Sequence, residues 1–560
     1  MKIILIFLSI MSFTSGISLS YAREQESLKT QFYSSAGVAS AHPLASQAGV
    51  AVMEQGGNSA DAATAVAMAL AVVYPQAGNL GGGGFLLYRD DSGRVYSLDF
   101  RESAPQGSRK DMYLQDPDKS RIGALAAGVP GTVRGFYYFH RRFGKLSWRQ
   151  VLQPAIRLAR DGFILNEYLA RSLKNAEHKL NQFPESAAVF LQNGKAPGAG
   201  ERLVQKDLAR TLIAVAKGGD SEFYEGKTAR RIVNTIQKYG GIITLQDLKD
   251  YRAIERAPVT IRYHGYIIYA PPLPSSAGIV LAGLFNSLKT YDLQEFPLHS
   301  PAQIALFAEL EKHYFALRNQ LLGDADFVDV PSKKLLNPEF AREMAQKIDF
   351  KNPRAAGQIS AGKLLFPEHE ETTHFSVIDK QQQAVSVTYT LNGSYGSYLV
   401  ADSTGILLNN EMDDFTIQPD IPNQFGLVQG AANSIAPGKR MLSSMSPLIV
   451  TREGNLAGVL GTPGGPTIIT SVLQVLTHII DYGRPLDQAV ALPRFHHQWL
   501  PDTIFMEETL YKNAGHDPLK RWGFKMKKRD SIGDVQAAWR QPGGWLFCSD
   551  PRGNGIPKGF

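Results

Sequence analysis

The strongest constraint in this chain of 560 residues is a pair of alternating segments joined by a short polar loop. Residues 371–379 and 384–392 alternate apolar with polar side chains and are rich in β-branched and aromatic residues, as strands are. Five polar residues, Asp379 to Gln383, connect them, which is a hairpin length. The pattern predicts a β-hairpin symmetric about Gln381. Its expected register pairs Ile378 with Ala384, Phe375 with Val387, and Thr372 with Thr390.

The period of two in a strand separates the side chains of this hairpin into two faces. One face is apolar and predicts a core: Phe375, Val377, Val385, Val387, Tyr389 and Leu391. The other face is crowded with polar groups: Thr372, His374, Ser376, Thr388, Thr390 and Asn392. Such a row of hydroxyls is most often a solvated face, and the residues by themselves leave that interpretation open.

The same hairpin carries a motif. The segment from Glu371 to Val377, followed by Thr388 to Asn392, resembles the processing junction of γ-glutamyltranspeptidases, also called glutathione hydrolases. These are N-terminal-nucleophile hydrolases made as zymogens. The resemblance implies autocatalytic cleavage between Glu371 and Thr372, giving a large subunit, residues 23–371, and a small catalytic subunit, residues 372–560, that form a heterodimer. The new α-amine of Thr372, with a pKa of about 7.7 to 8, would then act as the base for its own hydroxyl.

Further matches along the chain imply the other site residues. By resemblance, Arg101 with Ser443 and Ser444 binds the α-carboxylate of the γ-glutamyl group. Asn392, Glu411 and Asp414 hold its α-ammonium. Thr390 orients the Thr372 hydroxyl, Gly464 and Gly465 form the oxyanion hole, and Phe425 lies in a lid loop over residues 418–430.

The residue types alone allow other interpretations of several of these positions. A strand-end arginine such as Arg101 is usually a surface charge, and paired serines before a strand usually make turns. The acids of residues 411–414 are also typical of a calcium loop, although the spacing of an EF-hand is missing. Ser275 and Ser276 precede a predicted helix and are expected to cap it.

The resemblance extends from about residue 36 to 552 and implies an α/β fold, an αββα four-layer sandwich built from both fragments. The implied activity is transfer of the γ-glutamyl group of glutathione and related compounds to water, or to amino acid or peptide acceptors, without a cofactor. No metal site is expected, because His374, His496 and His497 lack Cys or Glu partners at ligand spacing. A glutaryl-type acylase and an exported amino-acid-binding protein remain alternatives.

The first 22 residues predict a secretory signal peptide: Lys2, an apolar run over residues 3–8, and small residues ending at Ala22. We therefore expect an exported protein, periplasmic or secreted; a membrane anchor is the alternative, although the apolar run is short for a span. A formal net charge of +7 without a long Lys/Arg block does not indicate a nucleic-acid partner. The single cysteine, Cys548, excludes an internal disulfide, so a packed core must hold the fold.

Overall fold

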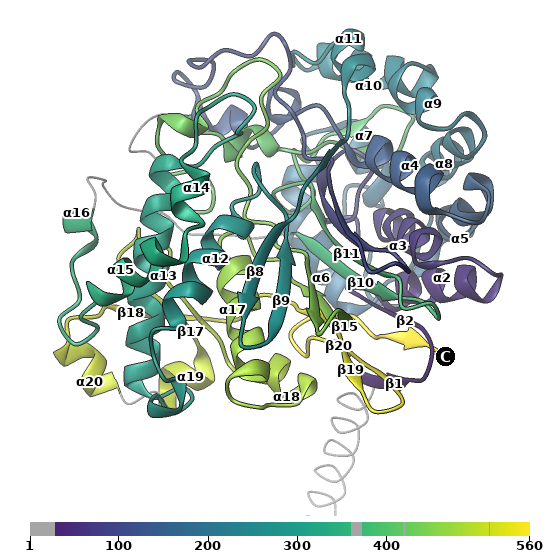
Figure 1. Ribbon diagram of the computed structural model, residues 1–560. Helices are drawn as coiled ribbons and strands as arrows, with labels where there is room; N and C mark the ends of the chain where they lie inside the picture. Colours follow the sequence, from purple (N-terminus) through teal and green to yellow (C-terminus); the bar gives the residue numbers. More distant parts are fainter. Residues whose placement is uncertain (1–28, 360–371, 418–421, 514–515) are drawn as a thin grey trace, which may run out of the picture.

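A computed structural model describes residues 29–359, 372–417, 422–513 and 516–560. Its fold is mixed α/β, with two antiparallel sheets of seven strands each at the centre. Figure 1 shows helices gathered on the two sides of the strands, with α2 to α5 on one side and α12, α13 and α15 on the other. The α/β class predicted from the sequence is confirmed.

The hairpin lies in the middle of one sheet, whose strand order is β21-β2-β10-β11-β3-β4-β7. The register of β10 and β11 pairs Ile378 with Ala384 and Phe375 with Val387, as predicted. The strands of this sheet are β2 (Gly37–Ser40), β3 (Gly83–Arg89), β4 (Val95–Asp99), β7 (Ile254–Arg256), β10 (Thr373–Ile378), β11 (Ala384–Thr390) and β21 (Lys558–Gly559).

The second sheet has the order β1-β20-β19-β15-β14-β9-β8, and β15 and β19 pack against β10. Its strands are β1 (Thr30–Tyr33), β8 (Val259–Tyr263), β9 (Tyr266–Ala270), β14 (Leu448–Arg452), β15 (Asn455–Gly461), β19 (Gln536–Gln541) and β20 (Gly544–Ser549). Smaller sheets pair β5 (Phe163–Ile164) with β6 (Arg202–Leu203), β12 (Val400–Ala401) with β13 (Ile406–Leu407), and β16 (Phe495–His496) with β17 (Ile504–Glu507) and β18 (Met526–Arg529).

Helices cover the outer faces of both sheets. On the side of the hairpin sheet lie α2 (Pro43–Glu54), α3 (Ser59–Val73), α4 (Thr132–Phe143), α5 (Trp148–Asp161), α6 (Glu167–Leu180), α7 (Pro184–Phe190), α8 (Lys206–Gly218), α9 (Asp220–Tyr224), α10 (Lys227–Lys238) and α11 (Leu245–Asp250). On the side of the second sheet lie α12 (Ala277–Leu288), α13 (Pro301–Leu321), α14 (Ser332–Leu335), α15 (Pro338–Gln346), α16 (Ala356–Ile359), α17 (Thr467–Ile480), α18 (Leu486–Ala491), α19 (Glu508–Asn513) and α20 (His516–Arg521). Within the described ranges, no helix combines the length and the apolarity that a membrane span requires.

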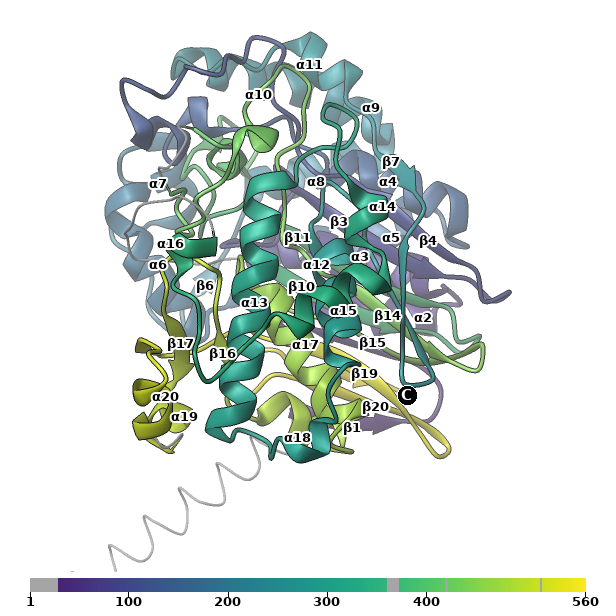
Figure 2. The ribbon, with the colours of Figure 1, turned by 60° about the vertical axis from the view of Figure 1, so that its left-hand side comes forward.

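Three apolar clusters fill the space between these layers. The apolar face of the hairpin packs into the first of them together with α3, which is buried along its whole length. The second cluster joins the other sheet to α12, α13 and α17 (Figure 2). The third lies between the two sheets and includes Ile378 from one and Val459 from the other.

The solvated-face interpretation of the hairpin's polar side is wrong, because every residue of β10 and β11 is buried. Their polar face lies against the second sheet, where hydroxyls find buried partners. Ser376 Oγ donates to the Gln536 carbonyl at 3.0 Å, and His374 Nδ1 lies 2.8 Å from Thr388 Oγ1. Sheet-on-sheet packing therefore explains the row of Ser and Thr.

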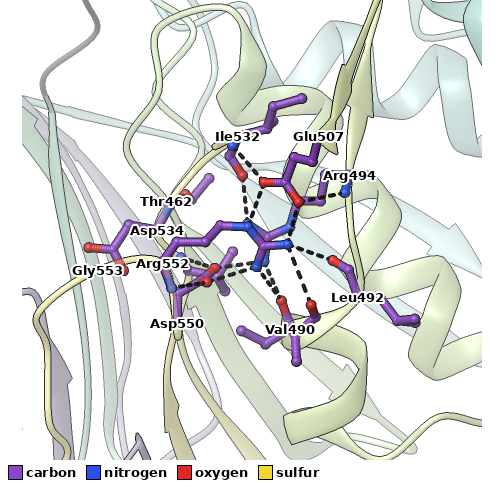
Figure 3. A network of polar contacts seen from close by, with 12 residues as sticks. Thr462, Val490, Leu492, Arg494, Glu507, Ile532, Asp534, Asp550, Arg552 and Gly553 are labelled. Carbon is purple, nitrogen blue, oxygen red and sulfur yellow. Dashed lines mark hydrogen bonds and ion pairs between the residues drawn. The ribbon is translucent and has the colours of Figure 1, made fainter. Parts of the chain in front are cut away.

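A buried ionic network connects the segment after β20 with the segment after α18 and with β17 (Figure 3). Arg494 Nη2 donates to Asp550 at 2.6 Å, and Arg552 bonds both Asp550 and Glu507. The network reaches the loop after β15, since the Asp534 N–H donates to Thr462 Oγ1 at 2.8 Å. It thus fixes the segment that leads to Gly464.

Candidate active site

One cavity gathers residues from six separate parts of the chain, between Arg101 and Ile468. Most of the site residues predicted from the sequence line it. The lining residues are Arg101, Arg318, Thr372, Thr390, Asn392, Asp414, Phe425, Leu427, Ser443, Ser444, Met445, Gly465, Pro466 and Ile468.

The two threonines stand at the open end of the hairpin. Thr372 directly precedes β10 and is 5% exposed, while Thr390 ends β11. The observed register pairs Thr373 with Tyr389, and extending it by one residue places Thr372 opposite Thr390. Thr390 Oγ1 accepts a hydrogen bond from the Asn392 N–H at 2.8 Å, so its hydroxyl is held at the cavity. Glu371, the residue predicted on the other side of the cleavage site, lies outside the described residues.

Arg101 is fully buried just beyond β4 and is surrounded by carboxylates, so it is not a surface charge. Its Nη1 lies 2.5 Å from Glu411 and 3.4 Å from Glu102, and its Nη2 lies 2.5 Å from Asp414. Glu411 contacts Arg101 but does not line the cavity itself. One guanidinium therefore serves three acids, and the cluster around it is acidic.

Burial governs the protonation of this cluster. Burial alone lowers the pKa of Arg101, but the Glu411, Asp414 and Glu102 carboxylates outweigh it and raise the pKa above its ordinary value. Burial raises the pKa of Glu102 to about 8 and that of Asp414 to about 6, although Arg101 pulls both down. Burial also raises the pKa of Glu411 well above its usual range. Asp414 is thus the acid that ionises most readily.

The calcium interpretation of residues 411–414 is not supported, because these acids face protein groups. Asp413 accepts from Ser120 at 2.6 Å, from Arg121 at 3.2 Å and from the Gln424 N–H at 2.7 Å. The other two predicted site acids turn to Arg101 instead. Among the described residues, no group of three or more His, Cys, Asp or Glu side chains is arranged to hold a metal ion.

The serine pair Ser443 and Ser444 lines the cavity, and residues just before α12 contact the backbone beside it. Ser276 was expected to cap α12, but its side chain makes no cap; it donates to the Ser443 carbonyl at 2.7 Å. Ser275 donates to the Met445 carbonyl at 2.7 Å, and its Oγ also accepts from the N–H of Ala277, the first residue of α12, at 3.2 Å, so it makes a capping contact as expected. The loop before α12 therefore supports the serine pair.

Arg318, which the sequence analysis missed, is the second arginine of the cavity. It projects from α13, a helix whose buried residues also include Glu309, Glu311 and Lys312. The sequence of α13 shows no clear polar face, so no sequence pattern pointed to Arg318.

The two predicted oxyanion glycines lie between β15 and α17, both with positive φ, 134° for Gly464 and 50° for Gly465. Gly465 lines the cavity, and Gly464 accepts at its carbonyl from Thr467 Oγ1 at 2.7 Å. Within the described part of the chain, neither glycine N–H donates a backbone hydrogen bond. The Gly465 N–H is thus a backbone donor at the cavity, and Gly464 is its neighbour in the chain.

In the described part of the predicted lid, residues 422–430, Phe425 and Leu427 line the cavity. Phe425 is 4% exposed and lines it, and its carbonyl accepts from Gln498 Nε2 at 2.9 Å. Asn423 connects the lid to the site, because its Nδ2 lies 3.4 Å from Asp414 Oδ1 while its Oδ1 accepts from the Phe425 N–H at 3.0 Å. Residues 418–421 lie outside the described residues.

His496 ends β16 and His497 follows it, and the two histidines have different partners, as the alternation of a strand predicts. His496 contacts Thr470 and Gln498, whereas His497 lies 3.2 Å from Asp502. Neither lines the cavity.

Comparisons with known proteins agree with this geometry. The sequence model described as gamma-glutamyltranspeptidase matches residues 45–560. The glutathione hydrolase proenzyme of Escherichia coli (strain K12) is 45% identical over 525 residues, 92% of this chain and 90% of that protein. A cephalosporin acylase from Bacillus halodurans superposes with a TM-score of 0.84 at 25% identity, covering 95% of this chain and 97% of the other. The Helicobacter pylori gamma-glutamyltranspeptidase chain gives a TM-score of 0.56 at 38% identity, covering 59% of this chain and 96% of the other.

Proposed function

The chain belongs to the γ-glutamyltranspeptidase family, and we propose that it is a glutathione hydrolase and γ-glutamyltransferase that acts through Thr372. The observation that carries the proposal is one cavity in which this threonine meets Thr390, Gly465, Arg101 and Asp414. A nucleophile, an oxyanion donor and groups of both charges in one site suit an acyl group that bears an amine and a carboxylate.

We propose that the chain is processed between Glu371 and Thr372 into residues 23–371 and 372–560, after removal of a signal peptide over residues 1–22 and export. The two fragments would remain together as a heterodimer, because β10 and β11 pair with β2 and β3 of the other fragment. Two sheets between helical layers agree with the αββα sandwich of N-terminal-nucleophile hydrolases.

In the proposed reaction, the freed α-amine of Thr372 removes the proton of its own hydroxyl, which attacks the γ-amide carbonyl. Thr390 orients that hydroxyl from the opposite strand. The N–H groups of Gly464 and Gly465 donate to the oxyanion, where preorganised donors contribute about 3 to 4 kcal/mol each. Cysteinylglycine takes that proton from the α-ammonium of Thr372 as it leaves, and the γ-glutamyl group passes from the Thr372 ester to water or to an amino acid or peptide.

Recognition of the γ-glutamyl group follows from the charges of the cavity. Arg101 and the hydroxyls of Ser443 and Ser444 would bind its α-carboxylate, since guanidinium pairs with carboxylate bidentately. The α-ammonium would be held by Asn392 and Asp414, with Glu411 behind them. Phe425 would close the site with an apolar ring that carries no hydroxyl.

The test of the nucleophile is self-cleavage. Wild type, Thr372→Ala and Thr373→Ala are compared on denaturing gels with mass spectrometry of the pieces, and with a γ-glutamyl anilide as substrate. Thr373 is the matched control, because it is the adjacent buried threonine and does not line the cavity. Only Thr372→Ala should stay whole and inactive. An uncleaved wild-type chain that hydrolyses the anilide contradicts the mechanism, and one that is whole and inactive favours an amino-acid-binding protein.

The likeness to a cephalosporin acylase makes a glutaryl-type acylase the second candidate. A glutaryl group lacks the α-ammonium, so it leaves the Asp414 carboxylate beside the cavity without a cation of the substrate. We therefore expect glutaryl anilide to be the poorer substrate. A kcat/KM for glutaryl anilide equal to or above that for γ-glutamyl anilide would favour the acylase.

A further inference from the structure

Arg318 is a buried cation for which the proposed mechanism has no role. Its side chain is 2% exposed, and it lines the cavity. Its N–H groups donate to uncharged acceptors: Nε to Ser276 Oγ at 3.0 Å, Nη1 to Asn319 Oδ1 at 2.8 Å and Gln429 Oε1 at 3.5 Å, and Nη2 to Ser444 Oγ at 3.0 Å.

Of the four other buried arginines of the described chain, three pair with carboxylates, and the fourth, Arg89, donates to backbone carbonyls. Arg101 has Asp414, Arg440 has Asp99 and Arg494 has Asp550. Within the described residues, Arg318 has no carboxylate at ion-pair distance, and a buried charge without a counter-ion is costly. Burial lowers its pKa to about 10, with attraction to Asp414 opposing the change, so it stays protonated at neutral pH. A cation of this kind at a cavity wall indicates an anion that arrives with the ligand.

The contacts of Arg318 also fix both members of the serine pair. Ser276 Oγ accepts a hydrogen bond from Arg318 and donates one to the Ser443 carbonyl at 2.7 Å, so it links the two residues. The Ser444 oxygen accepts from Arg318 directly. Because that oxygen already accepts a hydrogen bond, its own proton is directed to another acceptor, and the cavity lies beside it.

Arg101 cannot supply all the positive charge that a carboxylate needs here. Asp414, the acid of this cluster that ionises most readily, lies 2.5 Å from Arg101 Nη2 and already neutralises its charge. An additional carboxylate would be repelled by that cluster unless a second cation stood nearby.

We propose that Arg318 is the positioning and specificity-determining residue for the α-carboxylate of the substrate: it orients the Ser444 hydroxyl toward the carboxylate and supplies the compensating charge. The inference rests on the proposed function, since it names how that site distinguishes a γ-glutamyl group from one without an α-carboxylate.

The test compares two competitive inhibitors of γ-glutamyl anilide hydrolysis, L-glutamate and 4-aminobutyrate, which differ only in the α-carboxylate. The variants are Arg318→Met, Arg318→Lys and Ser444→Ala. Lys312→Met is the matched control, because it removes another buried cation of α13 that does not line the cavity.

For Arg318→Met, we expect the KM of the anilide and the inhibition constant of L-glutamate to rise about 10- to 100-fold, as for a lost hydrogen bond to a charged group. The inhibition constant of 4-aminobutyrate should change less than about twofold. The ratio of the 4-aminobutyrate constant to the L-glutamate constant therefore falls. Arg318→Lys should be intermediate, since an ammonium keeps the charge but not the fork. Arg318→Met combined with Ser444→Ala should cost less than the two single changes added.

An unchanged ratio in Arg318→Met, or equal losses for both inhibitors, overturns the inference. So does a ratio that also falls in Lys312→Met. If Arg318→Met yields no self-cleaved enzyme, Arg318→Lys decides, and a wild-type ratio there overturns the inference. A wild-type enzyme without γ-glutamyl anilide turnover contradicts the proposed function instead.

Discussion

Asp534 and Asp550 belong to one buried network but have opposite surroundings (Figure 3). Asp550 accepts from Arg494 at 2.6 Å and from Arg552 at 2.9 Å. Asp534 accepts from the uncharged Gln536 at 2.8 Å. Burial and the charge of Asp550 raise the pKa of Asp534 to about 7, against the weaker attraction of Lys29. We therefore predict that Asp534→Asn stabilises the protein at alkaline pH.

The magnitude follows from linkage. A carboxyl whose folded pKa exceeds its unfolded value of about 3.9 costs stability once the pH passes that value, and the full cost is present above the folded pKa. At about 1.36 kcal/mol per pKa unit, the cost is at most about 4 kcal/mol at pH 8 and about 1.5 kcal/mol at pH 5. Asparagine does not titrate. The gain in the free energy of unfolding should thus be about 2.5 kcal/mol larger at pH 8 than at pH 5.

Urea unfolding of wild type and Asp534→Asn at the two pH values measures this difference. Packing changes caused by the asparagine cancel, because they are the same at both pH values. Asp550→Asn is the control: burial raises the pKa of Asp550, but Arg494 and Arg552 outweigh it and lower the pKa, so its stabilising charge is present above pH 4. That variant should lose about 3 to 5 kcal/mol at pH 5 and somewhat less at pH 8, because the charge of Asp550 no longer raises the pKa of Asp534. A gain for Asp534→Asn that is equal at both pH values, or larger at pH 5, refutes the reasoning.

Three further predictions concern the cavity and its support. As the pH is lowered, log kcat/KM should fall with slope one below about pH 8, because the Thr372 amine protonates. Below pH 6 the slope should become two, because burial raises the pKa of Asp414 to about 6 and this acid also protonates. In Asp414→Asn the slope should stay at one. Arg101→Met should lower kcat/KM for γ-glutamyl anilide at least about 30-fold, since truncating one partner of a buried charge pair costs about 2 to 5 kcal/mol. An unchanged value would exclude a role in binding. Gly461→Ala should lower the free energy of unfolding by about 1 to 3 kcal/mol, measured by urea, because the new Cβ would stand 2.4 Å from the His374 ring; wild-type stability would show that the contact relaxes freely.

The structural features that depend on residues close together in the sequence could be predicted from the sequence. Alternation and loop length specified the hairpin and its register, because a slip of one residue would move every apolar side chain to the wrong face. The Ala-rich composition of residues 60–73 is likewise typical of a buried helix, and α3 has no exposed face. Several of the residues assigned to the site by resemblance line one cavity, while their roles stay predictions.

The partners of the polar groups were decided only by the tertiary structure. The row of hydroxyls on the hairpin is buried because the Gln536 carbonyl of the second sheet, distant in the sequence, lies against it. Ser276 bonds Ser443 rather than capping its helix, and Arg318 reaches the cavity from a helix whose sequence shows no clear polar face. Local sequence sets which side of an element a residue occupies. Burial and charge compensation depend on what packs against that side, and only the assembled layers determine it.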